Sequence, residues 1–335
     1  MKLASLNTYW GRRAALALGD DLIDLSAACA ARLHQDGGHT MRQALRLSQL
    51  AMPAAMGDIL ALADGLDRAR ELADWIAGAL QHDPERLASI HWKMGQMALA
   101  PAVPEPSKIW CMGANYVDHR REMAAKQGGP PLAERLQGFL KAPSALIGPF
   151  DDIVLPPESQ HVEFEMELAY VIGRRARRVT EEQCFDYIAG YVAFNDVSAR
   201  DVPLLDNRRM DRGKGFDTFA VMGPWFVTKD EVPDPHNVSI KLRLNGELKQ
   251  DGNTRDLMKD IPYQMAWLTA AMTLEPGDVI STGSPSGTCP MKPGDVIEGE
   301  VEGVGHIRNR IVADPAPPSA YGVPQIPSPT TVGEG

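Results

Sequence analysis

HVEFEMEL, at residues 161–168, runs directly into the apolar stretch AYVI at residues 169–172. Successive side chains of a β-strand point to opposite faces, so this stretch predicts a strand with Glu163, Glu165 and Glu167 on one face and apolar residues on the other. Carboxylates that share one face raise one another's pKa or need a cation between them. Two interpretations follow: a site for a hard divalent metal ion, or an edge strand whose polar face is solvated.

The composition predicts a globular protein in a reducing compartment. The chain has 335 residues, of which 44% are hydrophobic and 23% charged, and this length allows two domains. The net charge of -10 argues against a nucleic-acid-binding surface, because such surfaces are basic. The four cysteines lack the spacing of a zinc or redox site. No apolar stretch approaches the ~20 residues of a membrane span, and residues 1–19 lack the order of a secretory signal. We therefore expect a cytoplasmic protein without a membrane or nucleic-acid partner.

The first 105 residues predict a small helix-containing domain. Helical periodicity is clearest at residues 41–50 and 54–80, and residues 16–25 predict short strands around a turn at 19–21. Three prolines, Pro101, Pro104 and Pro106, mark its end.

Residues 106–313 predict a strand-rich second domain, which makes the fold class α+β. Strands are expected at residues 108–113, 144–148, 164–173, 188–195, 225–228, 239–245, 279–282, 295–301 and 306–312. Asn245 and Gly246 predict a two-residue hairpin turn, and Pro262 predicts the first turn of a helix over 261–273. The proline-rich tail at 314–335 is expected to be extended and poorly ordered unless it docks on a neighbour.

Two further segments carry candidate chemistry. The apolar strand that starts at Tyr191 ends in Asp196, which predicts either a third oxygen ligand for a hard ion or an N-cap for residues 197–202. His119 and Glu122 lie three residues apart, so in a helix the carboxylate can orient the imidazole as a general base. The alternative for this pair is an ordinary surface contact.

Seven motifs, in this order, resemble the fumarylacetoacetate hydrolase family. The resemblance covers about residues 106–313 and rests on GANY at 113–116 with His119, GFLK at 138–141 with Pro143 and Ser144, EMEL at 165–168 with VIG at 171–173, ND at 195–196 with ARD at 199–201, KGFD at 214–217 with GP at 223–224, NGE at 245–247, and TGSP at 282–285 with PGD at 293–295. Each motif alone is weak, but together they favour the metal site over the solvated edge strand. The resemblance implies a mixed β-sheet roll.

The resemblance also implies residue roles. Glu165, Glu167 and Asp196 would bind a magnesium ion, with manganese or calcium as alternatives, and Glu163 would lie beside the ion. The catalytic residues would be the water-activating dyad of His119 and Glu122, together with the active-site lysine Lys214.

Five residues are predicted to bind substrate: Tyr116, Arg200, Gln250, Thr282 and Gly283. Alternatives stay open for two of them, because Arg200 with Asp201 can form a structural ion pair or cap, and Gln250 can close a hairpin. Ser284 stands where the family pattern has threonine, and the loop at 287–293 looks shortened, which leaves the substrate size open.

The implied activity is hydrolysis of the carbon–carbon bond of an acylpyruvate, a 1,3-diketo acid such as fumarylpyruvate, in aromatic-compound catabolism. The reaction would pass through an enolate held by the metal ion. The alternative is a lyase, decarboxylase, isomerase or hydratase of a 2-keto acid at the same site. A non-catalytic binding module is disfavoured because the dyad, the lysine and the ligands are all present. The expected partners are a small keto-acid substrate and a second copy of the chain in a homodimer.

Overall fold

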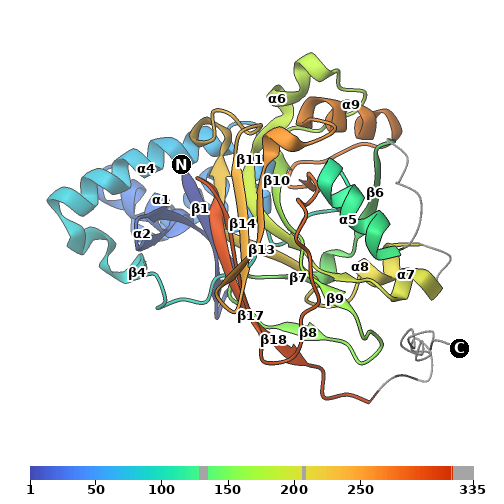
Figure 1. The fold of residues 1–335 in the computed structure, drawn as a ribbon. Helices are drawn as coiled ribbons and strands as arrows, with labels where there is room; N and C mark the ends of the chain where they lie inside the picture. The colour runs from blue at the N-terminus through green and yellow to red at the C-terminus, as the bar shows by residue number, and fades with distance from the viewer. Residues whose placement is uncertain (128–134, 206–208, 318, 320–335) are drawn as a thin grey trace, which may run out of the picture.

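The computed structural model describes residues 1–127, 135–205, 209–317 and 319 (Figure 1). It confirms the predicted α+β class, with strands dominating a mixed-sheet structure. Of the tail predicted at 314–335, residue 318 and residues 320–335 lie outside the described residues.

The largest sheet runs through the whole molecule. Its strands, in spatial order, are β4 (His91–Lys93), β3 (Asp21–Asp24), β2 (Gly11–Leu18), β1 (Lys2–Thr8), β13 (Ala220–Thr228), β11 (Ile188–Asp196), β10 (Met166–Ile172), β16 (Val279–Ser281), β5 (Ile109–Gly113) and β6 (Gln137–Lys141), with β7 (Leu146–Ile147) beside β13. Most neighbours are antiparallel, whereas β16 is parallel to β5 and β7 is parallel to β13.

A second sheet packs against the middle of the first. It contains β15 (Glu247–Asn253), β14 (Ser239–Leu244), β17 (Val296–Val301), β18 (Gly305–Ala313) and β8 (Ile153–Leu155). Leu168 and Tyr170 of β10 share one hydrophobic core with Ile240 and Ile307 of this sheet. The predicted turn at Asn245 joins β14 to β15, with positive φ values of 52° at Asn245 and 83° at Gly246.

Most helices lie at the two ends of the large sheet. They are α1 (Leu25–Gln35), α2 (Met41–Ala51), α3 (Met56–Ala61), α4 (Gly65–His82), α5 (Val117–Gln127), α6 (Cys184–Tyr187), α7 (Val202–Leu205), α8 (Asp211–Lys214) and α9 (Ile261–Ala271). The predicted helix over 54–80 is two helices, α3 and α4. The prediction missed β1 and α1, although Asp24 gives a recognisable N-cap by accepting the backbone N–H of Ala27. Within the described residues, no helix has both the length and the apolar character needed to cross a bilayer.

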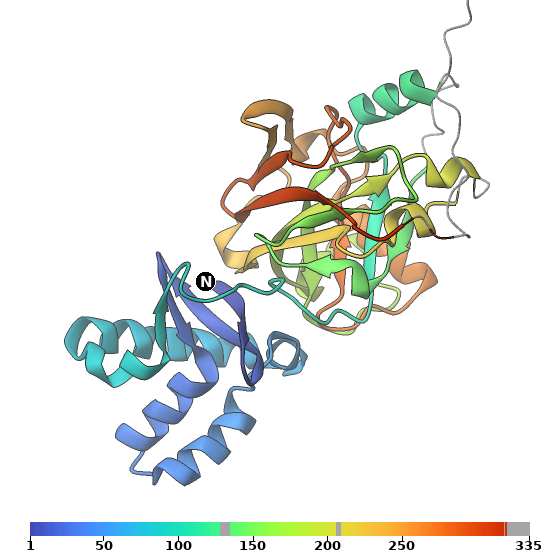
Figure 2. The ribbon, with the colours of Figure 1, turned by 90° about the horizontal axis from the view of Figure 1, so that it is seen from below.

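The N-terminal elements gather at one end of the molecule, away from the strand-rich part (Figure 2). They nevertheless continue the large sheet, because β1 pairs with β13 through Lys2 with Val227 and Leu3 with Phe226. The division of the chain at residue 105 into two domains stays a prediction.

The stretch at 161–172 is not one continuous strand. β9 (Val162–Glu163) ends at Glu163 and pairs with β12 (Ser198–Ala199), while β10 begins at Met166. β10 lies between β11 and β16 and is buried on both faces. The solvated edge-strand interpretation is therefore wrong, and the glutamates of this stretch are enclosed by protein.

Candidate active site

Three buried carboxylates converge where two central strands lie side by side. Glu165 immediately precedes β10, Glu167 lies on it, and Asp196 ends the neighbouring strand β11. The antiparallel register, with Met166 opposite Asn195, brings the three together. One oxygen from each carboxylate lies within 4.8 Å of the others, and the three side chains are almost inaccessible to solvent. Asp196 caps no helix, since the next helix, α7, begins at Val202, so the N-cap interpretation is wrong.

The electrostatics of this group fit a divalent cation. Burial, together with the negative charges of Asp196 and Glu165, raises the pKa of Glu167 well above its usual value. Glu167 is oriented by two donors, the hydroxyl of Ser281 and the backbone N–H of Gly283 at 2.8 Å. Carboxylate oxygens are the ligands that hard ions such as Mg²⁺, Mn²⁺ and Ca²⁺ prefer. The residues present therefore suit an ion of this kind.

Two buried lysines flank the carboxylates. Lys214, at the end of α8, forms an ion pair with Glu165 and a second one with Asp196 at 2.7 Å. Burial lowers the pKa of Lys214, but the negative charges of Asp196 and Glu165 outweigh it, so the pKa is raised. Lys141, at the end of β6, lies 2.6 Å from Oδ1 of Asp196 and also donates to the carbonyl oxygens of Val197 and Lys214.

Lys141 belongs to the GFLK motif, but the sequence analysis assigned it no role. One sequence signal could have found it. Lys141 ends a segment with strand periodicity, and a lysine buried there needs a negatively charged or polar partner because an unpaired buried cation is costly. Its pKa is lowered, chiefly because it is fully buried. The structure thus places a second lysine at this carboxylate group.

Arg200 and Glu163 lie next to the group of three carboxylates. The guanidinium of Arg200 pairs with Glu163 at 2.9 Å and also with Glu165. Burial opposes ionisation of Glu165, yet Arg200 and Lys214 hold the pKa of this carboxylate well below its usual value. Arg200 therefore forms structural ion pairs, but with these two glutamates, whereas Asp201 accepts from the hydroxyl of Ser159 and the backbone N–H of Gln160. The side chain of Arg200 also lines a cavity.

The predicted dyad is present on α5. Nδ1 of His119 lies 3.1 Å from Oε2 of Glu122, and Nε2 lies 3.1 Å from Oε1 of Glu165. Burial favours the neutral imidazole, but hydrogen bonds to Glu122 and Glu165 outweigh it and raise the pKa of His119. Because the imidazole is buried, the pair is more than a surface contact. It joins the helix to the carboxylate group.

A cavity of about 280 Å³ opens onto these residues. Its charged and ionisable lining residues are His119, Glu165, Glu167, Asp196, Arg200 and Lys214. The rest of its lining includes Met112, Met123, Gln137, Phe139, Pro203 and Met210. A small anionic molecule that enters would contact both the charged side chains and the apolar ones. This is the usual composition of a site for a small polar ligand.

The other predicted substrate-binding residues lie behind the cavity wall. Gln250 is fully buried, accepts the backbone N–H of Met166 and donates to Ser284, so it supports the start of β10. The hydroxyl of Thr282 donates to the carbonyl oxygen of Leu168. Tyr116 is buried, and its hydroxyl has no hydrogen-bond partner among the described residues. Along this loop, Ser284 lines the cavity, whereas Gly283 acts through its N–H on Glu167.

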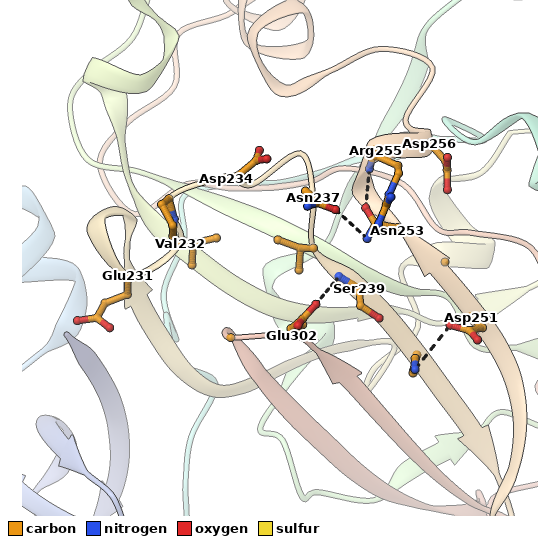
Figure 3. Close-up of a pocket in the computed structure, with 15 residues that line it drawn as sticks. Glu231, Val232, Asp234, Asn237, Ser239, Asp251, Asn253, Arg255, Asp256 and Glu302 are labelled. Atoms are coloured by element: carbon orange, nitrogen blue, oxygen red, sulfur yellow. Dashed lines mark hydrogen bonds and ion pairs between the residues drawn. The ribbon is translucent and has the colours of Figure 1, made fainter.

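A larger groove of about 880 Å³ lies elsewhere, between β14, β15 and the segment before them (Figure 3). Its walls carry Glu231, Asp234, Asp251, Asp256 and Glu302, with Lys241 and Arg255 as counter-charges. These acidic side chains are spread along the groove instead of converging on one point (Figure 3). The converging carboxylates and His119 of the dyad line the smaller cavity, which makes that cavity the candidate active site.

The chain matches a protein-family model over residues 108–312. That model describes the C-terminal part of fumarylacetoacetate (FAA) hydrolase. The match spans the whole candidate active site and more than half of the chain.

This chain belongs to the fumarylacetoacetate hydrolase family.

Other members of the fumarylacetoacetate hydrolase family resemble the chain over nearly its whole length. A maleylpyruvate hydrolase from Sphingobium sp. SYK-6, solved in complex with manganese(II) ion and pyruvate, is 32% identical with a TM-score of 0.69, covering 93% of this chain and 99% of that one. A 5-carboxymethyl-2-hydroxymuconate delta-isomerase from Mycobacterium smegmatis is 28% identical with a TM-score of 0.67, covering 94% of this chain and 100% of that one. These likenesses confirm the family fold.

A curated member of the same family carries a different activity. The mitochondrial oxaloacetate tautomerase Fahd2a from Rattus norvegicus is 39% identical over 221 residues, which are 64% of this chain and 69% of that protein. The family members similar to this chain therefore include a hydrolase, an isomerase and a tautomerase.

Proposed function

We propose that this protein is a metal-dependent hydrolase that cleaves the carbon–carbon bond of an acylpyruvate during the breakdown of aromatic compounds. The observation that carries the proposal is the position of His119. This base faces Glu165 at 3.1 Å in the cavity and is held from behind by Glu122 at 3.1 Å. Hydrolysis needs a base that activates water, and the dyad supplies one beside the carboxylate group. The similarity to a maleylpyruvate hydrolase over 93% of the chain supports the same reaction class.

Glu165, Glu167 and Asp196 would hold the ion, here proposed as Mg²⁺. When bound, a divalent ion would supply Lewis-acid chemistry for the keto-acid end of the substrate. Ser281 and Gly283 orient Glu167, and the two lysines orient Asp196, so the ligand set is fixed before the substrate arrives.

The protein's own residues then handle the protons. In the neutral form of His119, Nδ1–H donates to Glu122 and leaves Nε2 unprotonated, so that Nε2 takes a proton from water and the resulting hydroxide adds to the distal carbonyl carbon. The bond between that carbon and the methylene carbon breaks, and its electron pair stays with the pyruvate part. Proton return from His119 to the methylene carbon completes a balanced reaction, in which one acylpyruvate and one water give one carboxylic acid and one pyruvate. The ammonium of Lys214 meets the negative charge that develops on oxygen.

A second candidate is tautomerisation or isomerisation of a 2-keto acid at the same site. The specific observation in its favour is the 39% identity to an oxaloacetate tautomerase. This reaction moves a proton and consumes no water. Decarboxylation, lyase and hydratase reactions of a 2-keto acid are further alternatives at the same site.

One experiment separates these candidates. The purified protein is incubated with Mg²⁺ or Mn²⁺ and with fumarylpyruvate, maleylpyruvate, acetylpyruvate or the enol form of oxaloacetate. Hydrolysis is followed by loss of diketone absorbance together with pyruvate formation, and tautomerisation by loss of enol absorbance without pyruvate. We expect chelator-sensitive pyruvate formation from an acylpyruvate, reduced about 100-fold or more in His119→Gln and Glu122→Gln. Enol conversion of oxaloacetate without cleavage of any acylpyruvate would refute the hydrolase assignment.

A further inference from the structure

Glu163 is a buried carboxylate that the candidate metal group does not use. Its side chain is 1% exposed, yet it lies outside the group formed by Glu165, Glu167 and Asp196. Four side chains donate to it. Oε1 faces Lys126 at 3.0 Å and His161 at 3.0 Å, whereas Oε2 faces Arg200 at 2.9 Å and Thr288 at 2.8 Å. A carboxylate with this many donors is a fixed anchor point.

Lys126 brings the end of α5 to this anchor. Its ammonium donates to Glu163 and also contacts the carbonyl oxygen of Thr288 at 2.6 Å and the hydroxyl of Thr288 at 3.0 Å. It also pairs with Glu122, one turn earlier on the helix, at 3.4 Å. One side chain therefore connects the dyad helix, Glu163 and the loop at Thr288.

The same loop holds the dyad from a second direction. The backbone N–H of Gly287 points to both carboxylate oxygens of Glu122, at 3.2 and 3.3 Å. Thr288, the next residue, donates to Glu163. Glu122, which orients His119, is therefore connected to Glu163 through the consecutive loop residues Gly287 and Thr288.

Apolar packing gives α5 little support of its own. Among its described side chains, Met123 is the buried large apolar one, at 9% exposure, whereas Val117 is 43% exposed. The other side chains of α5 that are buried, those of His119 and Arg120, are polar. A helix with so few apolar contacts opens easily, so polar contacts at its end contribute much of its order.

We propose that Lys126 is a positioning residue that latches α5 onto Glu163 and Thr288 and thereby holds His119 and Glu122 over the carboxylate group. This inference deepens the proposed function and rests on it for its kinetic part. Its structural part concerns only the order of α5 and stands without any assumption about the substrate.

The structural part is tested by hydrogen–deuterium exchange of the full-length protein with Mn²⁺ as the only added ligand. The variants are Lys126→Met, which keeps the aliphatic stem, and Thr288→Val, which removes the hydroxyl. Arg121→Met is the matched control, because Arg121 lies on the same helix, is 75% exposed and, within the described part of the chain, forms its ion pair with Asp118, three residues away. We expect faster exchange of the α5 amides in both latch variants, while the control and the amides of β10 and β11 stay as in the wild type.

The kinetic part uses an acylpyruvate that the wild type cleaves. A misplaced base lowers the rate of the chemical step, so we expect Lys126→Met to lose about tenfold or more in kcat. KM and the Mn²⁺-dependent rise in Tm should stay near their wild-type values, since Lys126 touches no candidate ligand of the ion. Lys126→Arg, which can still reach Glu163, should recover part of the loss.

The outcomes are distinguishable. Unchanged α5 exchange in both Lys126→Met and Thr288→Val would overturn the latch whatever the enzyme does. A wild-type kcat in Lys126→Met would overturn the kinetic part, namely that Lys126 positions His119 and Glu122 for the reaction. If no acylpyruvate is cleaved by the wild type but α5 exchange rises in the latch variants, the proposed function fails and the latch stands.

Discussion

The ammonium of Lys141 lies 2.6 Å from Oδ1 of Asp196, and both side chains are almost completely buried. Lys214 contacts the other oxygen of the same carboxylate at 2.7 Å. Asp196 is therefore held between two lysines that come from different parts of the chain. The ion pairs fix the direction of a candidate metal ligand before any ion binds.

Removal of Lys141 tests this relationship. Breaking a buried ion pair leaves an uncompensated charge, so Lys141→Met should lower the free energy of unfolding by about 3–5 kcal/mol. Mn²⁺ should restore part of the loss, because a cation bound at the group replaces the missing positive charge. The measurement is chemical denaturation with and without Mn²⁺.

Lys108→Met is the matched control for Lys141→Met. Lys108 pairs with Asp278, a buried carboxylate outside the candidate metal group. Its loss should also destabilise the protein, but Mn²⁺ should stabilise this variant only as much as the wild type. If Mn²⁺ raises the free energy of unfolding by the same amount in Lys141→Met and in Lys108→Met, the role given to Lys141 is contradicted.

Glu167→Gln should separate metal binding from folding. Burial and two neighbouring negative charges raise the pKa of Glu167, so a neutral side chain of the same shape relieves repulsion in the metal-free protein. We expect the metal-free variant to melt at or above the wild-type Tm. The rise in Tm produced by Mg²⁺ or Mn²⁺ should be lost, whereas the exposed control Glu300→Gln should keep it. A normal metal-dependent rise in Glu167→Gln would show that the ion does not use this carboxylate.

Lys214→Ala should lose turnover but keep the ion. Removing a preorganised donor to a developing negative charge typically costs about 100-fold or more in kcat. The metal-dependent rise in Tm should remain, because the three carboxylates are still present. Turnover within a few-fold of the wild type would remove Lys214 from the mechanism.

Acid should weaken one ion pair in the N-terminal part. Hydrogen bonds from Lys93 and His91 lower the pKa of Asp21 below its usual value, and burial only partly opposes them. A lowered pKa in the folded state means that the pair stabilises the protein at neutral pH and loses this contribution as the pH falls through the folded-state pKa. The difference in Tm between the wild type and Asp21→Asn should therefore be present at pH 7 and shrink towards pH 3. A Tm difference that stays constant from pH 7 to pH 3 would refute the lowered pKa of Asp21 and the stabilising role of its ion pair.

The strand pattern was largely predictable because it is local. Apolar runs and alternating residues give β10, β11 and β14 directly, and the two-residue turn at Asn245 follows from the φ values that asparagine and glycine tolerate. β1 was missed, although it is seven residues long and largely buried. All seven of its residues pair with β2 in a hairpin, whereas only Lys2 and Leu3 pair with β13. The hairpin is a local feature, but the pairing with β13 joins residues more than 200 positions apart and leaves no local sequence signal.

For the site, the sequence by itself determined which side chains are available: carboxylates at 165, 167 and 196, the dyad three residues apart on a helix, and a lysine at 214. Only the tertiary structure decided which of them share a cavity. It places Glu163 outside the group that contains Glu165 and Glu167. Gln250 and Thr282 support β10 behind the cavity wall, Lys141 pairs with Asp196, and Lys126 pairs with Glu163. The physical reason is that side-chain chemistry is set residue by residue, whereas the charge balance of a buried site depends on strands and helices that meet only after the chain has folded.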